Sequence, residues 1–135
     1  MVAAAAPEDP EQAFRAVLKM VLTVISDPEI SAAPRLVLSE APRFPELAAY
    51  YRTHVIDIGQ RTFRTLFATG IERGVFREID THAALRAVMG PVIAHMLLTN
   101  VFNRPGDPQH DPAAMADALA DIVLNGLKPR PGTPS

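Results

Sequence analysis

The hydrophobic positions of residues 82–102 fall on two sides of a helix, and no other segment of the chain is as long and as apolar. A surface helix needs only one apolar side, so a helix with two must be buried against its own chain and against something else. The pattern therefore predicts a central helix whose second partner is another copy of the chain. At about 100° per residue, one side carries Ala83, Ala84, Ala87, Ala94, Leu98, Val101 and Phe102, and the other carries Leu85, Val88, Met89, Val92 and Met96.

The other apolar positions also repeat at helical spacing, and no stretch alternates with the period of two that marks a strand. The sequence therefore predicts an all-α fold, an antiparallel bundle of about five to six helices. Cap residues and prolines set the expected ends. Besides the central helix, capped by Asp80 or Thr81, the expected helices run from Pro10, capped by Asp9, to Asp27, from about Ser31 to before Pro42, from Pro45 to Val55, from about Thr53 to Arg73 with Gly74 as terminator, and from Pro112, capped by Asp111, to Leu127.

One domain accounts for this pattern, because 135 residues bury enough surface to hold a core without a metal or a disulfide. Residues 8–127 are expected to form this helical domain. The lead at residues 1–7 and the proline-rich tail at residues 128–135 are expected to be disordered.

Composition narrows the classes of function. The net charge is −2 and the 13 basic residues are scattered, so the chain has no electrostatic footprint for nucleic acid. The absence of cysteine excludes disulfides and thiolate chemistry and fits a cytoplasmic protein. The apolar run at residues 1–6 is too short for a signal peptide and lacks its basic flank.

A membrane span is a competing interpretation of residues 82–102, and their content argues against it. The uninterrupted apolar run, residues 87–94, contains Gly90 and Pro91 and ends at His95, well short of the about 20 residues that a bilayer requires. Pro91 also removes an amide from the helix, so a kink is expected there. No membrane partner is expected.

The chemistry-bearing residues form no catalytic or metal-binding pattern. The chain has no phosphate-binding glycine loop and no nucleophile elbow, and its serines at helix ends and faces, Ser26 and Ser39, have no identifiable base. The other three histidines are not at metal-ligand spacing from His95 or from each other. The sequence predicts no enzyme, no metal and no cofactor.

His95 has two interpretations, because it lies between the two apolar sides of the central helix. It either contacts a ligand or is a buried histidine bonded to a neighbouring carbonyl or water. The aromatic and methionine side chains also have two interpretations. Such side chains adapt to the shape of a small molecule, but they also fill hydrophobic cores. Their periodicity by itself favours a core.

Four segments of the chain combine into one specific pattern, although each is weak alone. They are RLVLSEAPRFPELAAYY at residues 35–51, GIERGVFREID at residues 70–80, MGPVIAHMLL at residues 89–98 and ADALADIVLNGL at residues 116–127. Together they resemble the C-terminal half of TetR-family transcriptional regulators. The "EAPRFPEL" turn, Glu40 to Leu47, matches a turn between two ligand-domain helices of that family. The Glu72, Arg73 and Gly74 link, followed by Asp80, precedes the family's dimer helix, in which a Gly-Pro pair such as Gly90 and Pro91 is common.

This resemblance covers residues 7–127 and implies an effector-sensing and dimerisation domain, expected to belong to a repressor. It implies a small apolar effector in a helical pocket, with the ligand-binding candidates Tyr51, His54, Phe63, Phe67, Leu85, Met89, Val92, His95 and Met96. Residue size supports a two-fold homodimer in which the central and last helices pair with their copies as a four-helix bundle. The dimer-interface candidates are Ala87, Ala94, Leu98, Phe102, Met115, Leu119 and Ile122. The open alternative is a structural homodimerisation domain with a packed core and no small-molecule ligand.

The sequence departs from the family at its beginning. TetR-family proteins begin with a DNA-binding helix-turn-helix domain of roughly 50 residues, and nothing here corresponds to it. The chain is therefore expected to be either a truncated regulator or a stand-alone sensor, and it is expected to bind no nucleic acid by itself.

Overall fold

The computed structural model describes residues 9–131, and every regular element in that part of the chain is a helix. The predicted all-α fold is confirmed. The lead expected at residues 1–7 and the last four residues of the expected tail lie outside the described residues. The helices are α2 (Pro10–Ser26), α3 (Ala32–Glu40), α4 (Pro45–Tyr51), the π-helical η1 (Arg52–Ile56), α5 (Asp57–Glu72), α6 (Thr81–Asn100) and α7 (Pro112–Leu127).

The predicted helix caps are confirmed at three N-termini. The Asp9, Asp80 and Asp111 side chains accept backbone N–H bonds from the first turns of α2, α6 and α7, where no earlier carbonyl is available. After α5, Gly74 adopts a φ of 74°, the left-handed conformation that glycine reaches without strain. The loop then folds back, and Phe76 becomes buried in the core.

The chain between Pro45 and Glu72 differs from the expected pair of helices. The segments α4, η1 and α5 follow one another without a break, so residues 45–72 form one long helical rod with a single π-helical stretch at residues 52–56. The sequence prediction placed two overlapping helices here, from Pro45 to Val55 and from about Thr53 to Arg73, and the π-helical stretch lies at their overlap. No residue of α3, α4 or η1 is buried.

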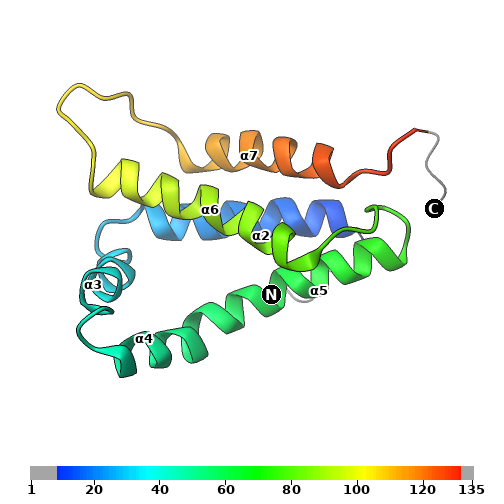
Figure 1. Cartoon of the computed structure of the whole chain (residues 1–135). Helices are drawn as coiled ribbons and strands as arrows, with labels where there is room; N and C mark the ends of the chain where they lie inside the picture. Colours follow the sequence, from blue (N-terminus) through cyan, green and yellow to red (C-terminus); the bar gives the residue numbers. More distant parts are fainter. Residues whose placement is uncertain (1–8, 132–135) are drawn as a thin grey trace.

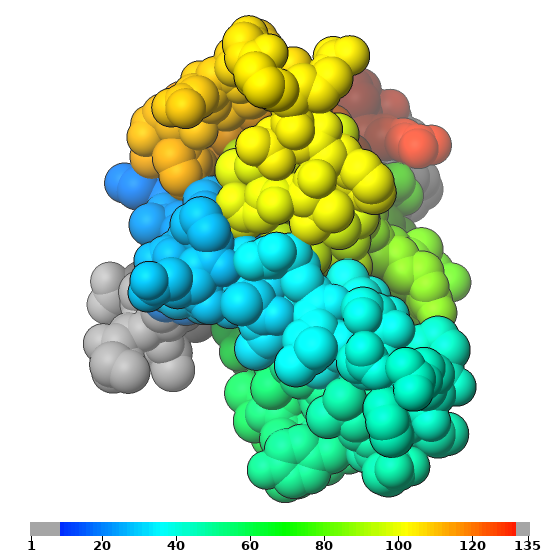
Figure 2. Space-filling model, turned by 90° about the vertical axis from the view of Figure 1, so that its left-hand side faces the viewer, coloured from blue at the N-terminus to red at the C-terminus, as the bar shows by residue number. Residues whose placement is uncertain are grey.

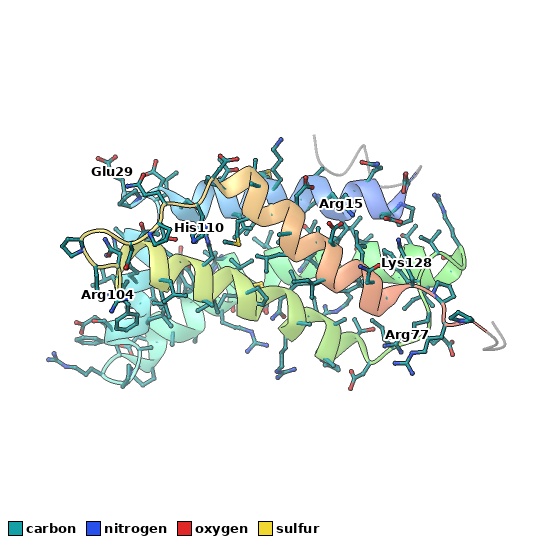
Figure 3. All side chains as sticks on the ribbon, turned by 90° about the horizontal axis from the view of Figure 1, so that it is seen from above. Arg15, Glu29, Arg77, Arg104, His110 and Lys128 are labelled. Carbon is teal, nitrogen blue, oxygen red and sulfur yellow. The ribbon has the colours of Figure 1, made fainter. Side chains whose placement is uncertain are left out.

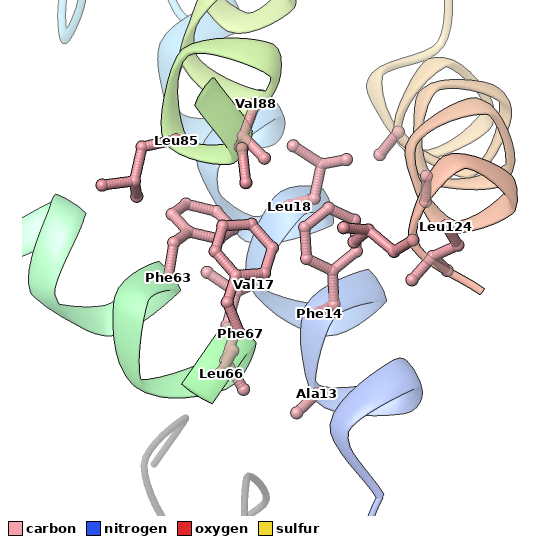
Figure 4. Packing of buried hydrophobic residues seen from close by; sticks show 14 of the residues in the cluster. Ala13, Phe14, Val17, Leu18, Phe63, Leu66, Phe67, Leu85, Val88 and Leu124 are labelled. Carbon is pink, nitrogen blue, oxygen red and sulfur yellow. The ribbon is translucent and has the colours of Figure 1, made fainter. Parts of the chain in front are cut away.

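The helix at the centre of the folded bundle is α2, and the expectation that α6 lies there is wrong. Figure 1 shows α2 between α7 and the α5 rod, with α6 alongside, and α2 packs against all three of these helices. Its fully buried Phe14 meets two rings of α5, with ring centroids 5.8 Å from Phe63 and 6.0 Å from Phe67 (Figure 4). Aromatic pairs at such distances stabilise a core beyond their buried area.

The last helix also packs differently from the expectation. Its buried side consists of Ala116, Ala120, Leu124 and Leu127, and α2 is its main partner. The small alanines allow the two helices to approach closely. At the rim, the Arg15 guanidinium of α2 pairs with the carboxylates of Asp117 and Asp121, and the bond to Asp121 raises the pKa of Arg15. The last helix is therefore held to its own chain mainly through residues other than the predicted interface candidates Met115, Leu119 and Ile122.

Within the described residues, α6 alone is long and apolar enough to cross a membrane, by length and composition only. The core helix of a protein in water passes the same test. One side of α6 is buried against α2 and α5, through residues that include Leu85, Val88 and Val92. The helix runs through Pro91 as a single element.

Candidate ligand cavity and apolar face

His95 contacts a serine at the end of another helix. Its Nε2 lies 2.9 Å from the hydroxyl oxygen of Ser26, the last residue of α2, and the His95 side chain is buried. The same hydroxyl lies 2.6 Å from the Leu22 carbonyl oxygen, which can only accept. Ser26 must therefore give its single proton to that carbonyl, and Nε2–H of His95 donates to the Ser26 oxygen.

This assignment leaves Nδ1 of the neutral imidazole as a bare hydrogen-bond acceptor. No hydrogen bond to Nδ1 is made within the described residues, and no fully buried side-chain nitrogen or oxygen there lacks a partner. Nδ1 must therefore reach open space. Burial, and to a smaller extent the nearby His110, lowers the pKa of His95. The ring is held in its neutral form with one nitrogen facing outward.

The open space beside His95 is a cavity of about 980 Å³. It lies at the end of the bundle shown in Figure 2, where the loop after α6, the start of α7 and the α2–α3 junction meet. Its polar wall includes Ser26, His95 and Asn100, and its apolar wall includes Leu98 and Leu119. The volume is at the upper end of the range that small-molecule sites occupy.

The polar wall is held in place by bonds between distant parts of the chain. The Asn100 amide donates to the Ile25 carbonyl at 3.2 Å and to the Ser31 hydroxyl at 3.0 Å. Ser31 itself is fully buried. These bonds join the end of α6 to the α2–α3 junction, so they hold the polar wall of the cavity in a fixed position.

The loop at residues 103–110 forms the outer rim and carries all the charged groups that line the cavity apart from His95. Asp107 accepts the Arg104 backbone N–H at 2.7 Å, and its carboxylate also lies 3.5 Å from the Arg104 guanidinium. Figure 3 shows Arg104 and His110 on this loop. The carboxylate of the rim is thus already paired with Arg104, and His110 is the other titratable group of the rim.

The other ligand-binding candidates are spread over three environments. Met89 and Tyr51 are partly buried, and burial raises the pKa of the Tyr51 hydroxyl. His54 is exposed and its ring lies against Tyr50, with ring centroids 4.2 Å apart and the two planes tilted by 38°. The remaining five are packed in the core and are at most 4 % exposed: Phe63, Phe67, Leu85, Val92 and Met96. The structure therefore brings His95 to an open cavity but not these core residues.

The dimer-interface candidates of α6 lie on its exposed side. Ala87 and Ala94 are exposed, and Leu98 and Phe102 are both 65 % exposed, an unusual state for large apolar side chains in water. On α7, Ile122 is 71 % exposed, whereas Met115 and Leu119 are partly buried against the core. Beside them, a groove of about 490 Å³ between α6 and α7 is lined by residues that include Ala83, Ala87 and Ile122. We call the exposed Ala87, Ala94, Leu98, Phe102 and Ile122 the apolar face.

Sequence reasoning missed the base beside Ser26, because His95 is 69 residues away and the pattern does not tell which helices face each other. The contact does not make Ser26 an activated nucleophile, since its proton is committed to Leu22 and no carboxylate orients His95 within the described residues. The same part of the chain contains no group of three acidic, histidine or cysteine side chains placed to hold a metal.

Comparison with known proteins gives one match. The family model described as "Tetracyclin repressor-like, C-terminal domain" matches residues 7–102, and no helix-turn-helix domain is detected in the sequence. No curated protein and no solved structure matches the chain. The family consists of regulatory domains that typically dimerise and bind effectors, and it is not enzymatic. The chain belongs to the tetracyclin repressor-like C-terminal domain family.

Proposed function

We propose that the chain is the effector-sensing and dimerisation domain of a TetR-like transcriptional regulator, expected to be a cytoplasmic repressor. Residues 8–127 act as the domain, with residues 1–7 and 128–135 outside it. Effector binding shifts the population between two arrangements of the dimer, and so changes the spacing of whatever the two copies carry. The chain by itself binds neither nucleic acid nor a membrane.

The observation that carries this proposal is the apolar face. Leu98, Phe102 and Ile122 are large and exposed, while Ala87 and Ala94 leave room for a close approach of another helix. A second copy related by a two-fold axis presents the same face and covers it, which makes α6 and α7 half of a four-helix bundle. The α6–α7 groove supports this proposal, because a partner helix can fill it.

The test is an Ala94→Arg variant studied by light scattering. Each substitution enters a two-fold interface twice, so two buried, unpaired guanidinium groups should cost several kcal/mol of association, on the order of a hundredfold or more in dimer affinity. We expect a dimer for the parent chain and a monomer for Ala94→Arg. The control is Ala68→Arg, at an exposed alanine of α5 outside the apolar face, which should remain dimeric.

A parent chain that stays monomeric at micromolar concentration would contradict the dimer proposal. An Ala94→Arg variant that dimerises as well as Ala68→Arg would contradict the assignment of the face.

For the effector, the cavity beside His95 offers the best support. Of the nine ligand-binding candidates it takes up only His95, so the aromatic pocket between Tyr51 and Phe67 is the weaker proposal. The packed rings of Phe63 and Phe67 favour a second candidate function at that position, a structural homodimerisation domain without a ligand. Ligand-dependent melting separates the two, because a ligand that binds only the folded chain raises its melting temperature.

A further inference from the structure

We propose that the cavity beside His95 binds an amphipathic weak organic acid, whose acidic group pairs with His95 Nδ1 and whose apolar body lies on the α6 and α7 wall. This inference rests on the effector-sensing role proposed above and names the chemistry of the effector.

The unpaired Nδ1 of His95 determines which chemical group a ligand can place against it. Ser26 fixes the proton of His95 on Nε2, so Nδ1 points its lone pair into the cavity. A bare acceptor that faces this open space is satisfied by a group that brings a proton, either water or a ligand that displaces it. The ring cannot turn to hide Nδ1 without giving up the bond to Ser26. A ligand group at this position must therefore either donate a hydrogen bond to Nδ1 or bind together with a proton that Nδ1 takes up from solvent.

An ammonium group also carries protons and could donate to Nδ1, so the charges that line the cavity decide between an amine and an acid. Apart from His95, the charged and titratable groups that line the cavity are Arg104, Asp107 and His110, and the walls from α2, α6 and α7 contribute none. Asp107 is already engaged by Arg104. The charges of Arg104 and Asp107 offset each other, so a cationic ligand would find no free carboxylate, whereas an acid finds in His95 a base that can hold a proton against it.

The apolar lining of the cavity determines the rest of the ligand. The apolar lining of the cavity includes the side chains of Pro91, Ala94, Leu98, Met115 and Leu119. Such a wall takes an aliphatic or aromatic body, whose burial supplies most of the affinity while the polar end sets the orientation. Ala94 and Leu98 also belong to the apolar face, and a partner copy seated there closes this side of the cavity. Ligand binding and dimerisation are thereby coupled.

The proton balance gives the proposal a measurable signature. In water near neutral pH a carboxylic acid is ionised and His95, whose pKa is lowered, is neutral. The complex pairs the carboxylate with an imidazolium, so binding takes up one proton from solvent. Affinity should therefore rise about tenfold for each unit by which the pH falls, as long as the pH lies between the pKa of His95 in the free chain and its higher pKa in the complex.

The experiment uses 2-naphthoate as the acidic probe and 2-naphthalenemethanol as a neutral probe of similar shape. Binding is followed by the imidazole NMR signals of the chain's 4 histidines. We expect 2-naphthoate to move the His95 signals to the imidazolium position, with the stated pH dependence. The neutral probe should bind without pH dependence and leave His95 neutral.

Three variants locate the effect. His95→Gln should weaken 2-naphthoate binding by about tenfold or more and remove the pH dependence, since an amide does not titrate. His110→Gln should keep the His95 response, because His110 is a neighbour and not the acceptor. His54→Gln, at an exposed position remote from the cavity, should behave like the parent chain.

The outcomes separate the acid from the effector role. If 2-naphthoate leaves the parent His95 signals neutral while the neutral probe perturbs them, the acid assignment is wrong and the effector cavity stands. If neither probe perturbs His95, both the acid and the effector cavity at this place are wrong. The parent titration decides these cases even when His95→Gln fails to fold.

Discussion

Gly70 is the residue on which the loop after α5 closes. Its carbonyl accepts the backbone N–H groups of Val75 at 2.9 Å and Phe76 at 3.0 Å. The Phe76 ring occupies the place where a Cβ on residue 70 would lie. The sequence identified Gly74 as the end of the helix. It did not identify Gly70 as a contact point, because that depends on a distance between ring and helix.

Replacing Gly70 with alanine should therefore destabilise the chain, although alanine is the better helix former. The new methyl group must displace the buried Phe76 ring, and such overpacking costs about 1–3 kcal/mol. Chemical denaturation measures the change.

The matched control is Gly59→Ala on the same helix, where a Cβ would meet nothing within 4 Å. That variant should gain up to about 1 kcal/mol from helix propensity. Equal effects of the two substitutions would show that the Phe76 contact does not matter.

His95 shows the same limit at a polar residue. The helical pattern placed it between the two sides of α6 and left open whether it is a ligand contact or a satisfied buried histidine. The structure combines the two, since Nε2 bonds to Ser26 and the ring lines the cavity. Neither the bond to Ser26 nor the position at the cavity could be predicted, because each requires knowing that the end of α2 faces the C-terminal part of α6.

At the scale of elements, α7 shows how a hydrophobic stripe can mislead. The larger side chains Met115, Leu119 and Ile122 drew the prediction, but the residues that are fully enclosed against the core include the small Ala116 and Ala120. Size is the reason, since α2 and α7 pack closely only where the side chains between them are short. A pattern that weighs residues by hydrophobicity alone ranks alanine too low for this role.

Enlarging Ala120 to leucine should separate α7 from α2. Ala120 is 0 % exposed, so the added atoms have no free space and the free energy of unfolding should fall by about 1–3 kcal/mol. Thermal or urea unfolding followed by circular dichroism gives the value.

Ala118→Leu serves as the comparison, because Ala118 is exposed on the same helix and should tolerate leucine with little change. If the two variants unfold alike, α7 does not dock on α2 through its small residues.

At the scale of the whole molecule, the bundle divides into a packed part and an open apolar face. The helices α2, α5, α6 and α7 share one core, while the outer side of α6 and Ile122 of α7 face away from it. A protein whose folded form is completed by a second copy gains stability by mass action. If the apolar face is covered by a second copy as proposed, the stability of this chain depends on its concentration.

The melting temperature of the parent chain should accordingly rise by several degrees over about a hundredfold increase in concentration. Differential scanning calorimetry at two concentrations measures this rise. The Ala94→Arg variant should melt at a temperature independent of concentration. A parent chain whose melting temperature is constant would argue that the monomer is the complete folding unit.

Sequence reasoning reached most of the architecture but little of the site. Helix ends were predictable because caps and prolines act on their neighbours in the chain, as Asp9, Asp80 and Asp111 do. The two sides of α6 were also separable, with Ala84 as the exception, since it is buried with the bulky residues. The central position of α2 was not predictable, because helices of similar amphipathicity do not state their order in a bundle.

The elements α3, α4 and η1, which bury no residue, divide the chain into two regions of unequal local stability. Opening this arm breaks helical hydrogen bonds but exposes almost no additional core, so its cost is far below that of unfolding the bundle. The π-helical turn at residues 52–56 lies between α4 of this arm and α5, which packs against α2 and α6. Local unfolding of this arm should therefore occur more often than unfolding of the bundle, and it leaves the aromatic core intact.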